Sequence, residues 1–121
     1  SVLGICLGMQ LLCRRSDESG TDCMGIFAQD VVKFAPGPKV PHMGWNSVTR
    51  LKGPLFSGLD EIYAYFVHSY RAEAGADTAG VTDYGGEFSA ALWRDNFYGV
   101  QFHPEKSGPA GRRILENFLA L

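Results

Sequence analysis

Cys6 stands where a nucleophile would be expected. It is the centre of Gly4-Ile5-Cys6-Leu7-Gly8, between a strand-like apolar run at residues 2–5 and a helix-like run at residues 7–15. Strand, Gly-x-nucleophile-x-Gly and helix together form a nucleophile elbow, in which glycines avoid collisions with the tight backbone. The first helix amides then favour a thiolate over a thiol. The alternative is a free cysteine that behaves as a small buried hydrophobe.

A candidate base lies near the other end of the chain, at His103. It closes the strand-like run Val100-Gln101-Phe102, and Glu105 follows two residues later. Residues i and i+2 of an extended chain point to the same side, and Pro104 holds His103 near β geometry. We therefore expect Glu105 to reach one ring nitrogen of His103 while the other faces a thiol. Cysteine, histidine and carboxylate are the parts of a nucleophile–base–orienter triad.

These residues, in this order and spacing, resemble the class I (triad-type) glutamine amidotransferases. Within that family, residues 41–46, 65–70 and 98–107 are similar to the glutaminase subunits of imidazole glycerol phosphate synthases, which serve histidine biosynthesis. The resemblance runs from Gly4 to Leu119. It implies a flavodoxin-like α/β fold, a mixed sheet with flanking helices. It also implies glutamine hydrolysis through a thioester on Cys6, with ammonia passed to a cyclase subunit built as a (β/α)8 barrel.

The resemblance assigns further roles by position. It implies that Gln10, Ser69 and Tyr70 contact the glutamine substrate, and the Leu7 amide, the first on the helix, is independently expected to be an oxyanion donor. Burial in the core is the alternative for Trp45, and a structural, hydrogen-bonded histidine is the favoured interpretation of His68. No metal or organic cofactor is needed. The positions implied to face the cyclase are Gly44, Trp45, Asn46, Tyr65 and Lys106.

Members of the family place several strands and helices before the elbow, including a Gly-rich loop that supplies a second oxyanion donor. We therefore expect residues 1–121 to be the C-terminal portion of a single amidotransferase domain, truncated at the N-terminus. Loss of one oxyanion donor costs about 2.7–4 kcal/mol in the barrier, so the chain alone should be very slow or inactive. The open sheet edge would invite a domain swap, an oligomer or a separate N-terminal piece.

Composition narrows the class of protein. The 121 residues are 45% hydrophobic, which suits one packed domain. A net charge of −2 gives no electrostatic argument for nucleic acid or an anionic membrane surface. No apolar stretch is long enough to span a membrane. Three cysteines without C-x-x-C spacing argue against a disulfide framework, so Cys13 and Cys23 are expected to be inert thiols in a cytoplasmic protein.

The distribution of glycine, proline, polar and apolar residues predicts the secondary structure. Gly, Pro and polar clusters indicate loops, alternation indicates strands, and Pro109 suits the first turn of a closing helix. The predicted elements are a polar loop at 16–21, a strand at 31–34, a loop carrying 42–46, strands at 47–50 and 62–70, a surface loop at 75–86, a hairpin of 88–93 and 97–102, and a helix from 107 or 108.

Three alternatives remain open from the sequence. The chain could serve another triad amidotransferase, of GMP, anthranilate, CTP or carbamoyl phosphate synthesis, although the His-Met-Gly-Trp-Asn segment at 42–46 argues against these. It could be a stand-alone thiol hydrolase of similar fold. It could also be a non-catalytic binding or assembly module.

Overall fold

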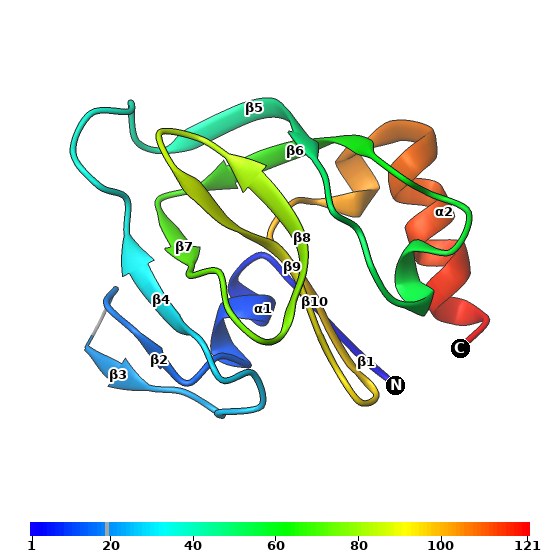
Figure 1. The fold of residues 1–121 in the computed structure, drawn as a ribbon, viewed down its shortest axis with the longest axis horizontal. Coiled ribbons are helices and arrows are strands. Elements are labelled where there is room, and N and C mark those ends of the chain that lie inside the picture. Colours follow the sequence, from blue (N-terminus) through cyan, green and yellow to red (C-terminus); the bar gives the residue numbers. More distant parts are fainter. Residues whose placement is uncertain (19) are drawn as a thin grey trace.

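The computed structural model describes residues 1–18 and 20–121 (Figure 1). Within them, an eight-stranded mixed sheet runs in the order β1-β10-β9-β7-β4-β2-β3, with β8 paired to β9, and β5 and β6 form a separate two-stranded sheet. The elements are β1 (Val2–Ile5), α1 (Leu7–Leu11), β2 (Arg15–Ser16), β3 (Thr21–Asp22), β4 (Asp30–Lys33), β5 (His42–Val48), η1 (Pro54–Phe56), β6 (Ile62–His68), β7 (Tyr70–Ala72), β8 (Thr78–Asp83), β9 (Glu87–Arg94), β10 (Phe97–Val100), η2 (Pro104–Lys106) and α2 (Gly108–Leu119).

Two hydrophobic clusters hold these elements together. The larger one joins the strands to α2, and its fully buried side chains include Phe66, Phe102 and Ile114. The smaller one lies around α1 and includes Met9 and Phe27. Figure 1 shows the consequence: α2 and η1 occupy one end of the molecule, while α1 lies beside the strands away from them.

The hairpin, one strand and the closing helix agree with the predictions made from the sequence. β9 and β10 are the predicted hairpin, joined at Asp95 and Asn96, with Phe97 paired to Arg94. Asp95 has a φ of 54°, which suits a two-residue hairpin turn. The strand predicted at 31–34 is confirmed as β4, and the closing helix is confirmed as α2 with Pro109 in its first turn. The mixed sheet of an α/β fold is therefore present.

Two predicted loops are strands. Residues 42–46 form most of β5, which pairs with β6 from His42↔His68 to Val48↔Ile62. Part of the surface loop predicted at 75–86 is β8, which pairs with β9 and is largely buried. A larger residue than glycine would not fit at position 80, because a Cβ there would lie 2.9 Å from a Val48 methyl carbon. Glycine here reflects close packing of the core, which the composition alone does not distinguish from a loop.

The first helix is shorter than predicted. α1 ends at Leu11, and Arg15 already belongs to β2, which pairs with β3 and β4. Arg14 N–H donates to the Gln29 carbonyl at 2.9 Å, so long-range backbone bonds replace further helical ones. Of the polar loop predicted at 16–21, residue 19 lies outside the described residues. The predicted strand at 62–70 is divided into β6 and β7.

β1 is the end strand of the described sheet. It pairs in parallel with β10, from Val2↔Phe97 to Ile5↔Val100, and with no second described strand. This agrees with the open edge expected from the sequence.

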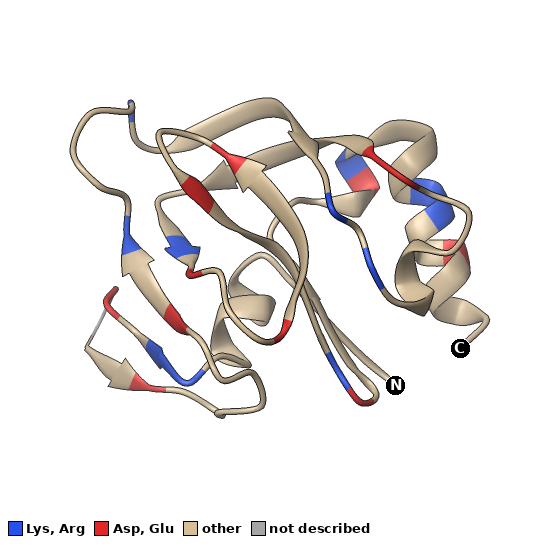
Figure 2. Cartoon of the chain, in the orientation of Figure 1, with Lys and Arg blue, Asp and Glu red and all other residues tan. Residues whose placement is uncertain are grey.

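Lysines and arginines are interspersed with acidic residues along the outer strands, the loops and α2 (Figure 2), in keeping with the small net charge.

Candidate active site

Cys6 lies on a strained turn between β1 and α1. Its backbone angles are φ 55° and ψ −112°, a combination that non-glycine residues rarely adopt. A Cβ on Gly4 would lie 2.7 Å from the Gly8 carbonyl carbon, so glycine is required there as predicted. A Cβ on Gly8 would meet no atom within 4 Å, so the same expectation is wrong for that position. The elbow is tight on the strand side only.

His103 reaches the site from the strand beside Cys6. Because Ile5 pairs with Val100, the residues after the two strands, Cys6 and Gln101, leave the sheet next to each other. His103 keeps the expected extended geometry, with φ −96° and ψ 103°. Its N–H donates to the Tyr65 carbonyl at 3.0 Å, and the Ser107 hydroxyl donates to its carbonyl at 2.7 Å. Both the backbone N–H and the backbone carbonyl of His103 are therefore fixed by hydrogen bonds.

The expected contact between His103 and Glu105 is present. Nδ1 of the ring lies 3.1 Å from Oε2 of the carboxylate, with the histidine 23% and the glutamate 55% exposed. A neutral ring in this pair carries its proton on Nδ1, so Nε2 is the nitrogen that can accept one. In the described part of the chain, Nε2 of His103 takes part in no hydrogen bond. The base that the sequence predicts is thus oriented, with one nitrogen unbonded.

The Cys6 thiol has two hydrogen bonds to distant residues in the described part of the chain, and His103 is in neither of them. The thiol donates to the Val67 carbonyl at 3.7 Å, and Gln101 Nε2 donates to the sulfur at 3.7 Å. No hydrogen bond joins the two candidate reactive groups, but both residues bond to β6, Cys6 at the Val67 carbonyl and His103 at the Tyr65 carbonyl. In unliganded enzymes such contacts are often long and tighten only when substrate is bound.

Burial raises the pKa of the Cys6 thiol. The Leu7 N–H and the Gln101 amide act in the opposite direction by hydrogen bonding, and the charges of Glu105 and Glu18 raise the pKa a little further. The sequence predicted that the helix amides would favour a thiolate. The Leu7 amide does so, as predicted, but partial burial has the larger effect and leaves the pKa of the thiol raised. The catalytic roles of Cys6, His103 and Glu105 remain predictions.

A cavity of about 230 Å³ opens beside the sulfur. Its lining includes the carboxylate-bearing Glu18, the amide-bearing Gln10, and residues at and after the end of β6. The sequence proposed three of these residues as substrate contacts, Gln10, Ser69 and Tyr70, and the fold brings all three to Cys6. The lining residues are Cys6, Leu7, Gln10, Glu18, His68, Ser69 and Tyr70.

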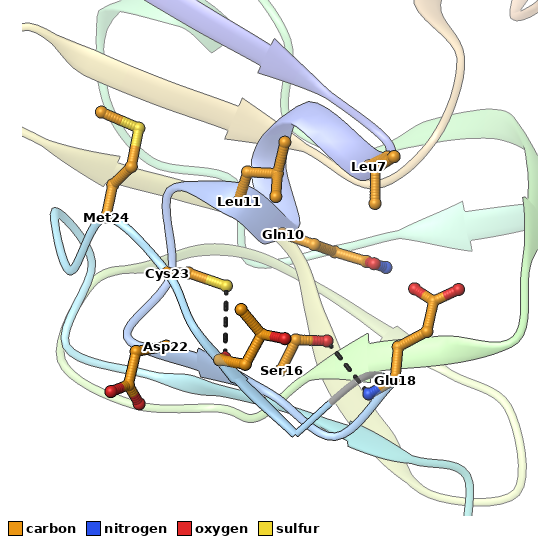
Figure 3. Close-up of a pocket in the computed structure, with 9 residues that line it drawn as sticks. Leu7, Gln10, Leu11, Ser16, Glu18, Asp22, Cys23 and Met24 are labelled. Carbon is orange, nitrogen blue, oxygen red and sulfur yellow. Dashed lines mark hydrogen bonds between the residues drawn. The ribbon is translucent and has the colours of Figure 1, made fainter.

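Glu18 is the lining residue that sequence reasoning missed. It lies in the polar segment after α1, where a glutamate looks like an ordinary surface charge. Its side chain also borders a neighbouring cavity of about 430 Å³, which shares Leu7 and Gln10. Figure 3 shows the Glu18 carboxylate and the Gln10 amide on the same side of that space. The one signal in the sequence is that Glu18 lies a short way along the chain from the elbow. This signal becomes informative only when the segment after α1 is known to fold back towards Cys6.

The outer face of the β5–β6 sheet carries an aromatic cluster. Trp45 is 47% exposed and stacks on Tyr63, with ring centroids 5.9 Å apart. Tyr65 meets Trp45 edge-on at 6.0 Å, and Lys106 Nζ lies 5.9 Å from the Tyr65 ring centroid. The alternative that Trp45 is buried in the core is therefore wrong. Three of the predicted interface residues gather here.

Asn46 is separated from that cluster. Strand alternation turns it to the inner face, where Nδ2 lies 3.3 Å from His42 Nε2 and donates to the Asp83 carbonyl at 3.1 Å. His68 is buried and hydrogen-bonded, which agrees with the structural interpretation made from the sequence.

Two features of the described residues bear on other functions. No group of three or more His, Cys, Asp or Glu side chains in this part of the chain is arranged to hold a metal ion. Neither described helix has the length and apolar character that a membrane-crossing helix requires.

Comparison with known proteins places the chain in a known family. The family model for glutamine amidotransferase class-I matches residues 1–121. Relatives described as imidazole glycerol phosphate synthase subunit HisH include one from Bacteroides fragilis, 60% identical, and one from Escherichia coli K12, 54% identical. Each comparison covers 99% of this chain and 63% of the relative, so the chain spans less than two thirds of their length.

Solved structures give the same fold. A protein from Thermoplasma acidophilum described as a GMP synthase subunit superposes with a TM-score of 0.72 at 26% identity, over 98% of this chain and 55% of its own. A glutamine amidotransferase from Thermotoga maritima superposes with a TM-score of 0.61 at 20% identity, over 98% of this chain and 46% of its own.

Proposed function

Because the chain belongs to the class-I glutamine amidotransferase family, we propose that it hydrolyses the side-chain amide of glutamine through a thioester on Cys6. One observation carries the proposal. Cys6 sits on a strained turn that opens onto a cavity, and the oriented His103–Glu105 pair follows the strand hydrogen-bonded to its own. These are the parts that acyl transfer to a thiol requires.

The proposed reaction proceeds in two steps. His103 Nε2 takes the thiol proton while Cys6 Sγ attacks the amide carbon, and the Leu7 N–H donates to the oxyanion that forms. The C–N bond then breaks, and the protonated His103 gives its proton to the departing ammonia. In the second step His103 activates water, which attacks the thioester carbonyl. Glutamate and the free thiol are released, and Glu105 keeps Nδ1 of the ring protonated throughout.

The cavity suits the two ends of glutamine. The substrate carries an α-ammonium and an α-carboxylate in addition to its amide. We place the ammonium near Glu18, because that is the carboxylate in the lining. Gln10 and the main chain of Ser69 and Tyr70 would hold the rest of the molecule against Cys6. No metal or cofactor has a part in this scheme.

We further propose that the whole enzyme passes its ammonia to a cyclase subunit built as a (β/α)8 barrel, for imidazole glycerol phosphate synthesis. The identities of 60% and 54% to HisH subunits support this over the GMP synthase alternative, for which the identity is 26%. The exposed cluster of Trp45, Tyr63, Tyr65 and Lys106 is the surface proposed to meet the cyclase, since aromatic anchors suit the centre of an interface. A cytoplasmic location fits three free cysteines.

Covalent labelling tests the proposal. The chain would be treated with a chloroketone analogue of glutamine, and the adduct located by peptide mass spectrometry. We expect modification of Cys6, protection by glutamine, and no adduct at this position in Cys6→Ala. Cys13 and Cys23 serve as internal controls within the same sample. Faster reaction at either of them than at Cys6 would overturn the elbow assignment and favour a non-catalytic module.

Glutamate release tests the assembled enzyme. The chain would be co-expressed with a cyclase subunit, with and without a supplied N-terminal segment taken from a relative. Release that requires the complete assembly and is lost in Cys6→Ala supports the proposal. Equal release from Cys6→Ala would end it, and release without any cyclase would favour a stand-alone hydrolase.

A further inference from the structure

Two buried histidines, His42 and His68, have no part in the mechanism above, although His68 lines the cavity. His42 Nδ1 lies 2.8 Å from His68 Nε2, and His68 Nδ1 lies 2.8 Å from the Tyr70 carbonyl. The two imidazoles are 3% and 6% exposed. His42 is stacked between the rings of Tyr84 at 4.0 Å and Phe66 at 4.8 Å, measured between centroids. This stacking fixes the plane of the His42 ring.

The Tyr70 carbonyl fixes the direction of every bond in this group. A carbonyl only accepts, so His68 must carry its proton on Nδ1, and its Nε2 must accept. His42 then donates through Nδ1 to His68, and its own Nε2 accepts from the Asn46 amide. Both rings are neutral in this arrangement. It agrees with burial, which lowers the pKa of each histidine to about 4.

The same carbonyl fixes a second series of bonds that ends at the nucleophile. Gln10 Nε2 donates to the Tyr70 carbonyl at 3.1 Å and to Gln101 Oε1 at 2.9 Å. Since Oε1 of Gln101 is thereby engaged, its Nε2 faces the other way, towards Cys6 Sγ at 3.7 Å. A flipped amide at Gln10 would set oxygen against oxygen, and one at Gln101 would set nitrogen against nitrogen. Gln101 is fully buried, so water cannot repair such a flip.

We propose that Gln101 is a positioning residue for Cys6, and that the Tyr70 carbonyl, backed by the His68–His42 pair, holds Gln101 so that its N–H points at the sulfur. An N–H at this place stabilises a thiolate and opposes the Val67 carbonyl, which favours the thiol. The proposal rests on the proposed function only in that Cys6 is the nucleophile.

Nuclear magnetic resonance of the unmodified chain provides the first test. Long-range ¹H–¹⁵N correlation at neutral pH reports which ring nitrogen of each histidine carries the proton. We expect His42 and His68 to be neutral with the proton on Nδ1. Assignment uses His42→Asn and His68→Asn. A proton on Nε2 of either ring would overturn the proposal, whether or not the variants below fold.

Thiol alkylation provides the second test. Iodoacetamide labelling of Cys6 would be followed by mass spectrometry across a pH series, with Cys23 in the same molecule as reference. Gln101→Met keeps the volume and removes the donor, so we expect Cys6 alkylation at neutral pH to fall about tenfold through a raised thiol pKa. Asn117→Leu is the matched control. It removes an amide that donates to the Leu55 and Ser57 carbonyls, away from Cys6, and should leave both rates unchanged.

A pair of substitutions at His68 separates positioning from simple packing. His68→Leu removes the donor to Tyr70 and should slow Cys6 alkylation about threefold, less than Gln101→Met because it acts through Gln10. His68→Asn places an amide donor where Nδ1 was and should restore the rate of the parent chain. Unchanged Cys6 alkylation in Gln101→Met would overturn the proposal. Because iodoacetamide needs no glutamine, this result is independent of whether glutamine is the substrate.

Discussion

The chain contains two kinds of histidine site, and they differ in what they leave free. His103 is partly exposed, has one carboxylate partner and keeps Nε2 unbonded within the described residues. His42 and His68 are buried, and all four of their ring nitrogens are engaged. Yet it is His68 that lines the cavity at Cys6. An imidazole becomes a base through an available nitrogen and a suitable pKa, and lining the cavity supplies neither.

Removing each histidine in turn should separate the two sites most strongly. His103→Asn removes the proposed base, so we expect labelling of Cys6 by the glutamine chloroketone to slow at least about a hundredfold. His68→Asn keeps the donor to Tyr70 and should slow it less than about threefold. The measurement is a mass-spectrometric time course. Equal slowing of Cys6 labelling in the two variants would contradict the different roles assigned to His103 and His68.

Acid should act on the stability of the chain through the buried pair. Folding lowers the pKa of His42 and His68 to about 4, below an unfolded value near 6.5. The unfolded state therefore binds more protons between these values, and the free energy of unfolding falls as pH drops from about 6.5 to 4. The loss is on the order of 3 kcal/mol for one imidazole.

Urea unfolding at neutral pH and at a pH near the folded pKa measures this loss. The double variant His42→Asn/His68→Asn should show a much weaker pH dependence. His103→Asn should keep the dependence of the parent chain. A flat profile in His103→Asn would instead assign the effect to the exposed histidine.

The carboxylate at His103 should matter less than the ring itself. Glu105 is more than half exposed, and the substitution Glu105→Gln would still offer an oxygen to Nδ1. For this variant we expect labelling by the chloroketone to slow roughly tenfold, through loss of the charge that stabilises the imidazolium. Glu105→Ala removes the acceptor as well and should be slower still. Labelling at the parent rate in both variants would show that the carboxylate does not orient the base.

The smallest effect concerns the far end of the buried pair. Asn46 donates to His42 Nε2, whereas the substitution Asn46→Asp would place a carboxylate there. In this variant the folded pKa of His42 should rise towards its ordinary value, so fewer protons are taken up on unfolding in acid. The loss of stability between neutral pH and pH near 4 should shrink by about 1 kcal/mol in urea unfolding. A steeper loss would contradict the bond direction assigned to this pair.

The sequence predicted the parts of the molecule that local chemistry determines. The elbow around Cys6, the His103–Glu105 spacing, the β9–β10 hairpin and α2 each depend on residues close together in the chain. The predicted substrate residues Gln10, Ser69 and Tyr70 also line one cavity, although their roles stay predictions.

What the sequence could not predict depends on distant neighbours. The segment 75–86 was predicted as a loop because it is rich in glycine and polar residues, whereas Gly80 is a glycine of β8 because Val48 lies against it. β5 begins after Pro41 and contains Gly44, and only its pairing with β6 makes it a strand. The raised pKa of Cys6 follows from burial, which no motif reports. Glu18 and the His42–His68 pair acquire meaning only from tertiary contacts.

The parallel pairing of β1 with β10 has a consequence for how reliably the reactive groups can meet. Four residue pairs align the strand that precedes Cys6 with the strand that leads to His103. A slip of one position would displace the sulfur by about 3.3 Å and turn it to the opposite face of the sheet. The slip is resisted by shape, because Met9 Cγ occupies the space where a Cβ on Gly99 would stand. The lack of a Cβ at Gly99 thus helps to maintain the register of β1 and β10.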